Sequence, residues 1–223
     1  MLPDGYLQPP RRDALKSLKS PRFPILTFDE WQLRLALGSF FKIEWLMPGE
    51  SLVSILWKFA RANALPGQVL LELIRSEVCE GVVPLRNAFD LTQLGRLIRL
   101  PRNVLTESLL DVTRGQRYVE AFRYCRHCAA HGYHSVLHQL TEEHSCPAHQ
   151  QSLETRCLEC LHEMPFIVSS RVIDAPFRCV WCGSHFGYGR LSSLSTTPAM
   201  RKKDIIAIRH RVQLRLRSDV GQR

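Results

Sequence analysis

The sequence lacks the features that mark membrane proteins, exported proteins and several large enzyme classes. No apolar run approaches 18 residues, and the opening MLPDGYLQPPRRD contains no apolar segment that could act as a signal peptide. We therefore expect neither a membrane span nor secretion. The patterns GxxxxGK(S/T), GxGxxG, GxSxG and HExxH are missing, as is the HxE…PCxxC pattern of zinc deaminases. With no positive indication of catalysis, we expect a protein that is not an enzyme.

The positive charge is confined to the two ends of the chain. The 223 residues carry 30 Lys and Arg against 21 Asp and Glu, and 45% of them are hydrophobic, which suits one substantial domain or two small ones. Residues 1–22 have a net charge of +3 and residues 201–223 of +6, whereas residues 23–200 hold 17 charges of each sign. The charge therefore predicts two basic terminal segments around a neutral middle.

Apolar periodicity in the first half predicts paired short helices. Residues 1–24 contain five prolines and predict an extended basic arm. The capping-box spacing of Thr27 and Glu30 predicts a short helix after them. A further helix is expected to end near Asn63, because Pro66 and Gly67 follow, and its partner should run from about 68 to 79. In the helix that ends near Asn63, one face holds Leu52, Ile55, Leu56, Phe59 and Ala60, and the other face holds Ser54, Lys58 and Arg61.

A second helical pair is expected over residues 90–110, with Asp90 or Thr92 as its cap and Pro101 opening its second helix. Arg96, Arg99 and Arg102 fall at the junction. They could contact nucleic-acid phosphates as in a helix-turn-helix, or be solvated side chains on a small bundle. The second reading is favoured, because neither helix shows a recognisable set of base-reading residues.

The C-terminal segment interleaves basic and apolar residues. Two readings stay open: an arm that neutralises DNA phosphates, or a strand-like or partner-binding segment that the arginines keep soluble. The candidate nucleic-acid contacts here are Arg201, Lys202, Lys203, Arg209 and Arg211.

Seven of the eight cysteines lie between residues 125 and 182. Together with His149 they form four knuckles, each a pair of candidate ligands separated by two residues. Two residues between ligands let one tight turn direct both at a single ion, and two knuckles complete a tetrahedron. Zinc suits such closed sets of soft and borderline ligands, and the ions are expected to be structural because no position stays open for water or substrate. The eight candidate ligands of two zinc ions are Cys125, Cys128, Cys146, His149, Cys157, Cys160, Cys179 and Cys182.

Sequential pairing of the knuckles is favoured, because each gap then suits a self-contained finger and the gap of 18 residues before Cys179 falls in the zinc-ribbon range. A cross-braced pairing uses the same ligands and stays open. An iron–sulfur cluster suits only the all-cysteine set, and free thiols or disulfides explain four regular knuckles poorly.

Other candidate residues receive plainer interpretations. His134 and His138 could share a helix face and hold a catalytic metal, but surface or core positions are favoured. We expect His127 to face solvent and Cys79 to be a buried small hydrophobe on a helix.

Over roughly residues 45 to 185 a short element, the helix after it and the four knuckles follow in a specific order: Pro48-Gly49-Glu50-Ser51-Leu52, Arg61-Ala62-Asn63, Cys146-Pro-Ala-His149, Leu153 and Cys157-Leu-Glu-Cys160. In this order the sequence resembles the TniQ family, which includes TnsD-type proteins. The resemblance implies a helical half with helix-turn-helix character joined to tandem zinc fingers, and a bacterial, cytoplasmic accessory protein of transposition. Members recruit or cap an AAA+ transposition regulator at a chosen target. Some link that regulator to an RNA-guided CRISPR effector complex, and TnsD-type members bind an attachment site directly.

We therefore expect a mainly α N-terminal half with helix-turn-helix-like pairs, followed by two tandem zinc-finger or zinc-ribbon modules of α+β type. The expected parts are an extended basic arm (1–24), a helical domain (25–118), a zinc-finger domain (119–195) and a basic tail (196–223). The favoured function is a non-catalytic adaptor in target selection, because longer relatives carry further C-terminal domains for target binding. Its partners would be an AAA+ regulator of the TnsC or TniB kind, target DNA, a CRISPR effector with its guide RNA, or a second copy of the chain. The alternatives are a stand-alone zinc-dependent DNA-binding or transcription regulator and, ranked last, a metalloenzyme.

Overall fold

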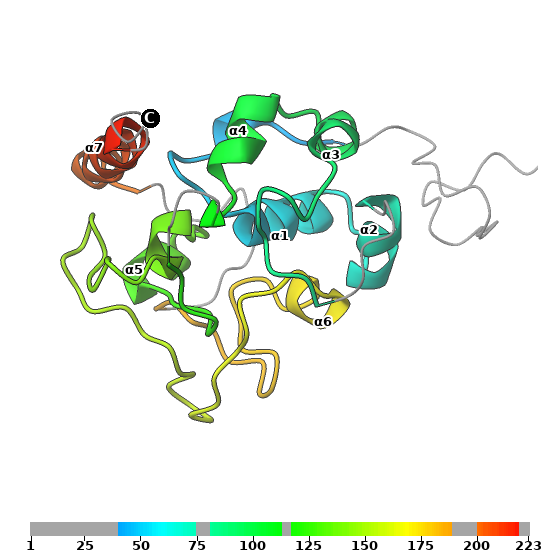
Figure 1. Ribbon diagram of the computed structural model, residues 1–223. Helices are drawn as coiled ribbons and strands as arrows, with labels where there is room; N and C mark the ends of the chain where they lie inside the picture. Colours follow the sequence, from blue (N-terminus) through cyan, green and yellow to red (C-terminus); the bar gives the residue numbers. More distant parts are fainter. Residues whose placement is uncertain (1–39, 75–80, 113–116, 189–199, 219–223) are drawn as a thin grey trace, which may run out of the picture. The chain divides into compact units, whose positions relative to one another are not determined.

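The computed structural model describes residues 40–74, 81–112, 117–188 and 200–218, all within one compact unit, Ser39–Arg223. The expected basic arm, the helix after Thr27 and Cys79 lie outside the described residues. These contain seven α-helices and two 3-10 helices, which are η3 (Ile43–Trp45), α1 (Leu52–Ala62), α2 (Gly67–Ile74), α3 (Leu91–Ile98), α4 (Arg102–Glu107), α5 (Arg126–Ala130), η5 (Val136–Gln139), α6 (Ser170–Ile173) and α7 (Lys202–Ser218) (Figure 1). None of these helices is both long enough and apolar enough to cross a bilayer.

Helix α1 lies at the centre of the fold. The Ser51 side chain caps it by accepting a hydrogen bond from the Ser54 N–H, and every residue from Leu52 to Ala60 is buried. Sequence periodicity correctly predicted its apolar face, but Ser54 and Lys58, expected on an outer face, are buried as well. Figure 1 shows α1 and α2 between the α3–α4 pair and α6, which packs on both.

A buried ion pair explains how α1 can be enclosed on its polar side. The Lys58 ammonium lies 2.6 Å from Glu50 Oε1, and the two side chains are 6% and 2% exposed. Glu50 also accepts hydrogen bonds from the Ser54 hydroxyl at 2.6 Å and from the Met47 N–H at 3.1 Å. Lys58 additionally donates to the Trp45 carbonyl at 2.8 Å. Burial of these charges is tolerated because each has several partners.

The second helical pair forms as predicted. Asp90 caps α3 by accepting from the N–H groups of Thr92 and Gln93, and these bonds lower the pKa of its carboxyl group. Arg99 ends α3 in the left-handed conformation, with φ at 60°, so that α4 can begin three residues later. Helix α2 begins at Gly67, earlier than expected, and residues 75–80 of the expected helix are not described.

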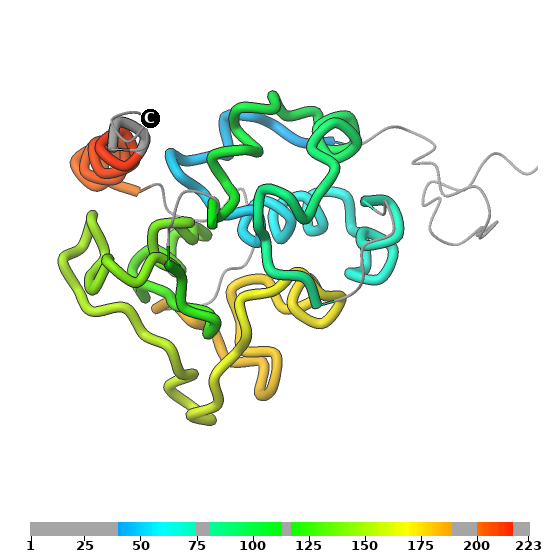
Figure 2. Tube along the Cα trace, in the orientation of Figure 1, coloured from blue at the N-terminus to red at the C-terminus, as the bar shows by residue number. Residues whose placement is uncertain are grey.

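The described part of the expected zinc-finger domain, residues 119–188, is called the zinc-finger region. It consists of short helices and turns. Figure 2 shows residues 117–188 as a winding trace, and the described residues contain isolated β-bridges but no strand. The β component of the expected α+β modules is therefore wrong for this part of the chain. No strand forms around these knuckles because the chain pairs across each of three of them through a single β-bridge. These bridges join Ser145 to Ser152, Arg156 to Glu163 and Arg178 to His185.

The helices and the zinc-finger region share one core. The Trp57 indole donates to the Val172 carbonyl at 2.5 Å, and its ring lies 5.7 Å from that of Phe122 and 4.7 Å from that of Phe177. Gly67 lies so close to α6 that an added Cβ would stand 2.3 Å from the Ser170 carbonyl oxygen. These contacts cross the expected boundary at residue 118.

The C-terminal segment is a helix, so the strand-like interpretation of it is wrong. Within α7, Asp204, Ile208 and Val212 are buried at a spacing of four residues, while Lys202, Lys203 and Arg209 are exposed. A spacing of four keeps three side chains on one helix face. Helix α7 therefore turns one narrow face to the rest of the unit and a basic face to solvent.

Candidate metal centres

The first cluster brings together three sulfurs and one imidazole nitrogen. His149 Nδ1 lies 3.4 Å from the Sγ atoms of Cys125 and Cys128 and 3.5 Å from that of Cys146. The Sγ atoms of Cys128 and Cys146 are 3.5 Å apart. A tetrahedron with arms of ~2.3 Å has edges of about 3.8 Å, so these separations are close to those around a zinc ion. The first cluster is thus geometrically suitable for one metal ion held by four protein ligands.

The second cluster consists of four sulfurs. Cys157 and Cys182 approach to 3.6 Å, as do Cys160 and Cys179, and the four ligand atoms lie within 4.8 Å of one another. The Ser184 hydroxyl lies 3.1 Å from the Cys157 sulfur and 2.9 Å from the Cys182 sulfur. Cys182 is exposed, so this cluster lies nearer the surface than the first.

The grouping of ligands confirms the sequential pairing. Knuckles one and two form the first cluster, and knuckles three and four form the second, so the cross-braced alternative is wrong. All seven cysteines involved are free thiols, which also removes the disulfide alternative for them. The ligand sets, three sulfurs with one imidazole and four sulfurs, both match structural zinc chemistry.

Knuckles two, three and four share one backbone turn. In each, the N–H of the residue four positions after the first cysteine donates to the carbonyl of that cysteine, at 2.8–2.9 Å. That residue adopts a positive φ in all three: 53° at Gln150, 62° at Leu161 and 73° at Gly183. The first knuckle differs because the chain continues from Cys125 into α5.

Neighbouring groups lower the pKa of some cluster thiols and raise that of others. A hydrogen bond from the Cys128 thiol is the largest effect that holds the pKa of Cys125 well below its usual range. Burial opposes ionisation of Cys157, but hydrogen bonds from the Cys160 N–H and the Ser184 hydroxyl help to outweigh it and lower the pKa to about 6. Each cluster therefore contains at least one thiol that favours the thiolate, the form that binds metal, although the pKa values of Cys128, Cys160 and Cys179 are raised.

The other nitrogen of His149 faces α7. His149 Nε2 lies 3.7 Å from Asp204 Oδ2, and both side chains are buried. Asp204 also accepts a hydrogen bond from Arg201 Nε at 2.8 Å. His127 was expected to face solvent, but it is half-buried, with ring centroids 5.1 Å from His149 and 5.0 Å from Tyr188. It is no ligand of either cluster.

His134 and His138 are core residues, one of the two positions favoured for them. His134 Nδ1 lies 2.7 Å from the Ser51 hydroxyl, and its Nε2 lies 2.8 Å from the Arg123 carbonyl. The carbonyl can only accept, so Nε2 carries the proton and Nδ1 accepts from Ser51. Burial lowers the pKa of both histidines, that of His138 to about 4, so both are neutral near pH 7. Neither belongs to a metal-binding group among the described residues.

The basic candidates fall on two surfaces. The side chains of Arg96, Arg99 and Arg102 are exposed where α3 meets α4, as the sequence predicted.

On α7 the five candidates separate into two roles. Arg201 bonds locally to Asp204, three residues later, and Arg211 Nε lies 2.5 Å from Glu143 Oε1, in the segment before Cys146. The exposed remainder is Lys202, Lys203 and Arg209.

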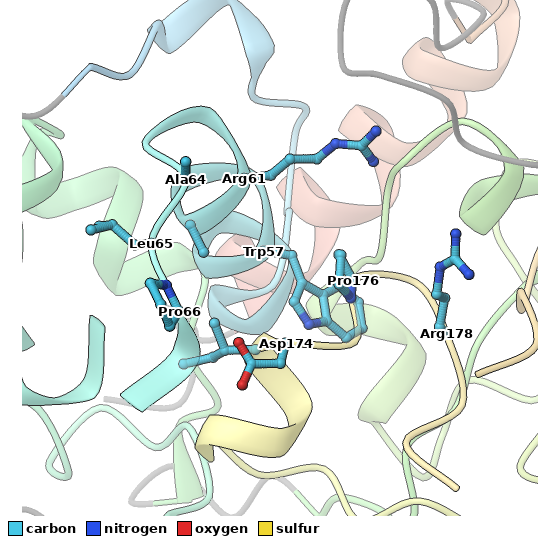
Figure 3. Close-up of a pocket in the computed structure, with 10 residues that line it drawn as sticks. Trp57, Arg61, Ala64, Leu65, Pro66, Asp174, Pro176 and Arg178 are labelled. Carbon is cyan, nitrogen blue, oxygen red and sulfur yellow. The ribbon is translucent and has the colours of Figure 1, made fainter. Parts of the chain in front are cut away.

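A hollow of about 670 Å³ lies between the end of α1 and α6. Figure 3 shows Asp174 below Trp57, with Arg61 and Arg178 extending away from that carboxylate. Asp174 accepts a hydrogen bond from the Gly67 N–H at 2.6 Å, at the start of α2. Its carboxylate is therefore already engaged in the fold. No local sequence pattern predicted this hollow, because its lining comes from segments more than 100 residues apart.

Comparison with known proteins adds no identification. No protein-family model matches the chain, and a search of curated proteins finds no similar sequence. Functional inference for this chain therefore depends on its residues and on the geometry described above.

Proposed function

We propose that the protein is a non-catalytic zinc protein that acts as an adaptor in transposition target selection and joins an AAA+ regulator to target DNA or to an RNA-guided effector. The observation that carries the proposal is the pair of four-ligand clusters. Each is completed by protein donors, and both belong to the same core as α1. Zinc bound in this way stabilises a scaffold and leaves no coordination position for substrate.

The residues behind the TniQ resemblance support the proposal because they form a structural junction. The Pro48 carbonyl accepts a hydrogen bond from the Tyr133 hydroxyl at 2.7 Å, and the Gly49 carbonyl accepts from the Val136 N–H at 2.9 Å. The Ser51 N–H donates to the His134 carbonyl at 2.9 Å. The short element thus ties the start of α1 to the segment between the first two knuckles. A motif with this role would recur wherever the same two-part scaffold is used.

Two exposed basic surfaces suit contact with nucleic acid: the α3–α4 junction and the outer face of α7. In this adaptor one or both would hold DNA phosphates, while the remaining surface is available to the regulator. Each Lys or Arg that neutralises a phosphate adds about 0.9 to the slope of log affinity against log salt concentration.

The direct test is reconstitution with the regulator ATPase of a neighbouring transposon gene. We expect zinc-loaded protein to co-purify with the ATPase in the presence of target DNA, and mass photometry of the complex to give its copy number. Absence of association, with DNA and without it, contradicts the adaptor role.

A stand-alone DNA-binding regulator is the second candidate, and the outer face of α7 favours it. A variant with Lys202, Lys203 and Arg209 changed to Ala should bind random duplex with a salt slope lower by about 3. Changing Arg96, Arg99 and Arg102 to Ala provides the matched comparison. Strong DNA binding without any ATPase association supports this candidate over the adaptor.

A further inference from the structure

Helix α7 is held against the first cluster by a small set of contacts. Ile208 is 1% exposed and Val212 is 8% exposed. Gly49 permits the close approach of α7, because a Cβ there would lie 2.5 Å from Val212 Cγ2. Arg211 pairs with Glu143, three residues before Cys146. Asp204 adds a further polar contact, with the ligand His149.

The chemistry of a coordinated imidazole gives this last contact a fixed donor, because the metal would hold both the position of the ring and its tautomer. His149 directs Nδ1 toward three sulfurs, so Nδ1 is the atom that would bind an ion. With Nδ1 committed, the proton of the neutral ring must be on Nε2, which then becomes a fixed donor directed at Asp204. The present separation of 3.7 Å exceeds a hydrogen bond, and a movement of under ~1 Å would close it.

Asp204 has one other side-chain donor among the described residues, Arg201. Its side chain is 4% exposed, and Arg201, its other partner, is 65% exposed. A buried carboxylate that loses a hydrogen-bond donor is destabilised, and so is the element that carries it. The second cluster has only sulfur ligands, which offer no second nitrogen to an outer partner.

We propose that Asp204 is the outer hydrogen-bond acceptor of the metal ligand His149, so that metal bound in the first cluster holds α7 in place and orients its exposed basic face. The effect of that face on DNA phosphates rests on the proposed function, whereas the coupling between metal and helix does not. Asp204 is a positioning residue in this scheme. It holds the ring that binds the ion, and the loaded ring in turn holds the helix.

The alternative is that α7 docks through Ile208 and Val212 alone, whatever the first cluster contains. The two schemes differ in what Asp204→Asn does to the metal-loaded protein. Glu143→Gln is the matched control, because it also removes one carboxylate charge from the α7 interface but touches no ligand. Circular dichroism at 222 nm of zinc-loaded Asp204→Asn controls for general unfolding.

The experiment measures metal release and helix exposure in the same sample of full-length protein. Zinc-loaded protein is titrated with a chromophoric chelator, while trypsin cleavage after Lys202, Lys203 and Arg209 reports whether α7 is docked. In the unaltered protein and in the Glu143→Gln variant, cleavage should begin only as zinc leaves the first cluster. In Asp204→Asn, α7 should be cleaved before any zinc is released, and zinc affinity at the first cluster should fall 10- to 100-fold, the range typical of outer partners.

Equal zinc affinity and equal cleavage in Asp204→Asn and Glu143→Gln overturn the proposal. Slow cleavage of the unaltered protein after the first cluster has lost its zinc overturns it too. Loss of most of the helical signal from zinc-loaded Asp204→Asn shows general unfolding in place of coupling, and so refutes the proposal. If the coupling is observed but the salt slope for duplex is the same with and without the three basic residues, the DNA role of α7 fails while the metal coupling stands.

Discussion

Removal of the metal from either cluster should unfold helix α1 together with the zinc-finger region. Chelation at neutral pH is the perturbation. The reason lies in the shared core, where Trp57 of α1 contacts Phe122, Phe177 and the Val172 carbonyl, all between the ligands of the two clusters or beside them. These side chains cannot keep their places once the knuckles around them open.

The free energies of zinc binding and of folding predict that both parts of the protein unfold in one transition. Structural zinc contributes on the order of 10 kcal/mol per site to folding, and a domain is typically stable by only ~5–15 kcal/mol in total. Loss of one ion therefore removes most or all of the net stability. A helical half that folded alone would instead lose little.

The assay combines circular dichroism at 222 nm with hydrogen exchange of the α1 amides, followed against zinc release. We expect the helical signal and α1 protection to disappear in one transition that coincides with release. Protection of residues 52–62 that persists after both ions have gone would refute the shared-core argument and restore two independent domains.

Three further outcomes are expected. Lys58→Met should destabilise the protein by about 3–5 kcal/mol in chemical denaturation, because it leaves the buried Glu50 carboxylate without its cation. His138→Phe should flatten the acid dependence of stability by up to about 1.4 kcal/mol per pH unit between its unfolded pKa near ~6.5 and its folded value. The sign follows from the pKa of about 4 in the folded protein, since the unfolded chain binds the extra proton and stability falls as the pH drops through that interval. Gly67→Ala should lower thermal stability by about 1–3 kcal/mol, because its Cβ would meet the Ser170 carbonyl oxygen at 2.3 Å.

Each of these has a matched control. The double variant Glu50→Gln with Lys58→Met should recover much of the loss, and a double variant as unstable as the single one contradicts the ion-pair argument. His210→Phe, at an exposed site of α7, should leave the acid slope unchanged, with both proteins measured at the same free zinc. Gln68→Ala, next to Gly67 and exposed, should shift stability by less than ~0.5 kcal/mol.

The metal ligands could be predicted because their information is local. A Cys-x-x-Cys or Cys-x-x-His spacing fixes a turn by itself, and two such turns need only one ion between them. The helices over residues 52–62, 91–98 and 102–107 could also be predicted from the sequence, because their apolar residues recur at helical spacing. Polar residues that cap helices, such as Ser51 and Asp90, precede the first two. Sequence reasoning worked where neighbours within a few residues decide the conformation.

The failures share a dependence on distant partners. Periodicity placed Lys58 outside, because nothing within one helical turn shows that Glu50 and the Trp45 carbonyl enclose it. Helix α7 was missed because its inner face is only Asp204, Ile208 and Val212, a pattern hidden among arginines. The role of Asp204 depends on His149, 55 positions earlier, which no local pattern can reveal.

The bond from Trp57 to Val172 joins residues 115 positions apart, which has a consequence for biosynthesis. At a translation rate of 5–20 residues per second, the indole emerges roughly 6–23 s before its acceptor is made. Throughout that interval the nascent chain carries a central helix whose Trp57 lacks its partners Val172 and Phe177. The third and fourth knuckles are synthesised late. Their synthesis therefore determines how long the nascent chain needs chaperones and when zinc must be supplied.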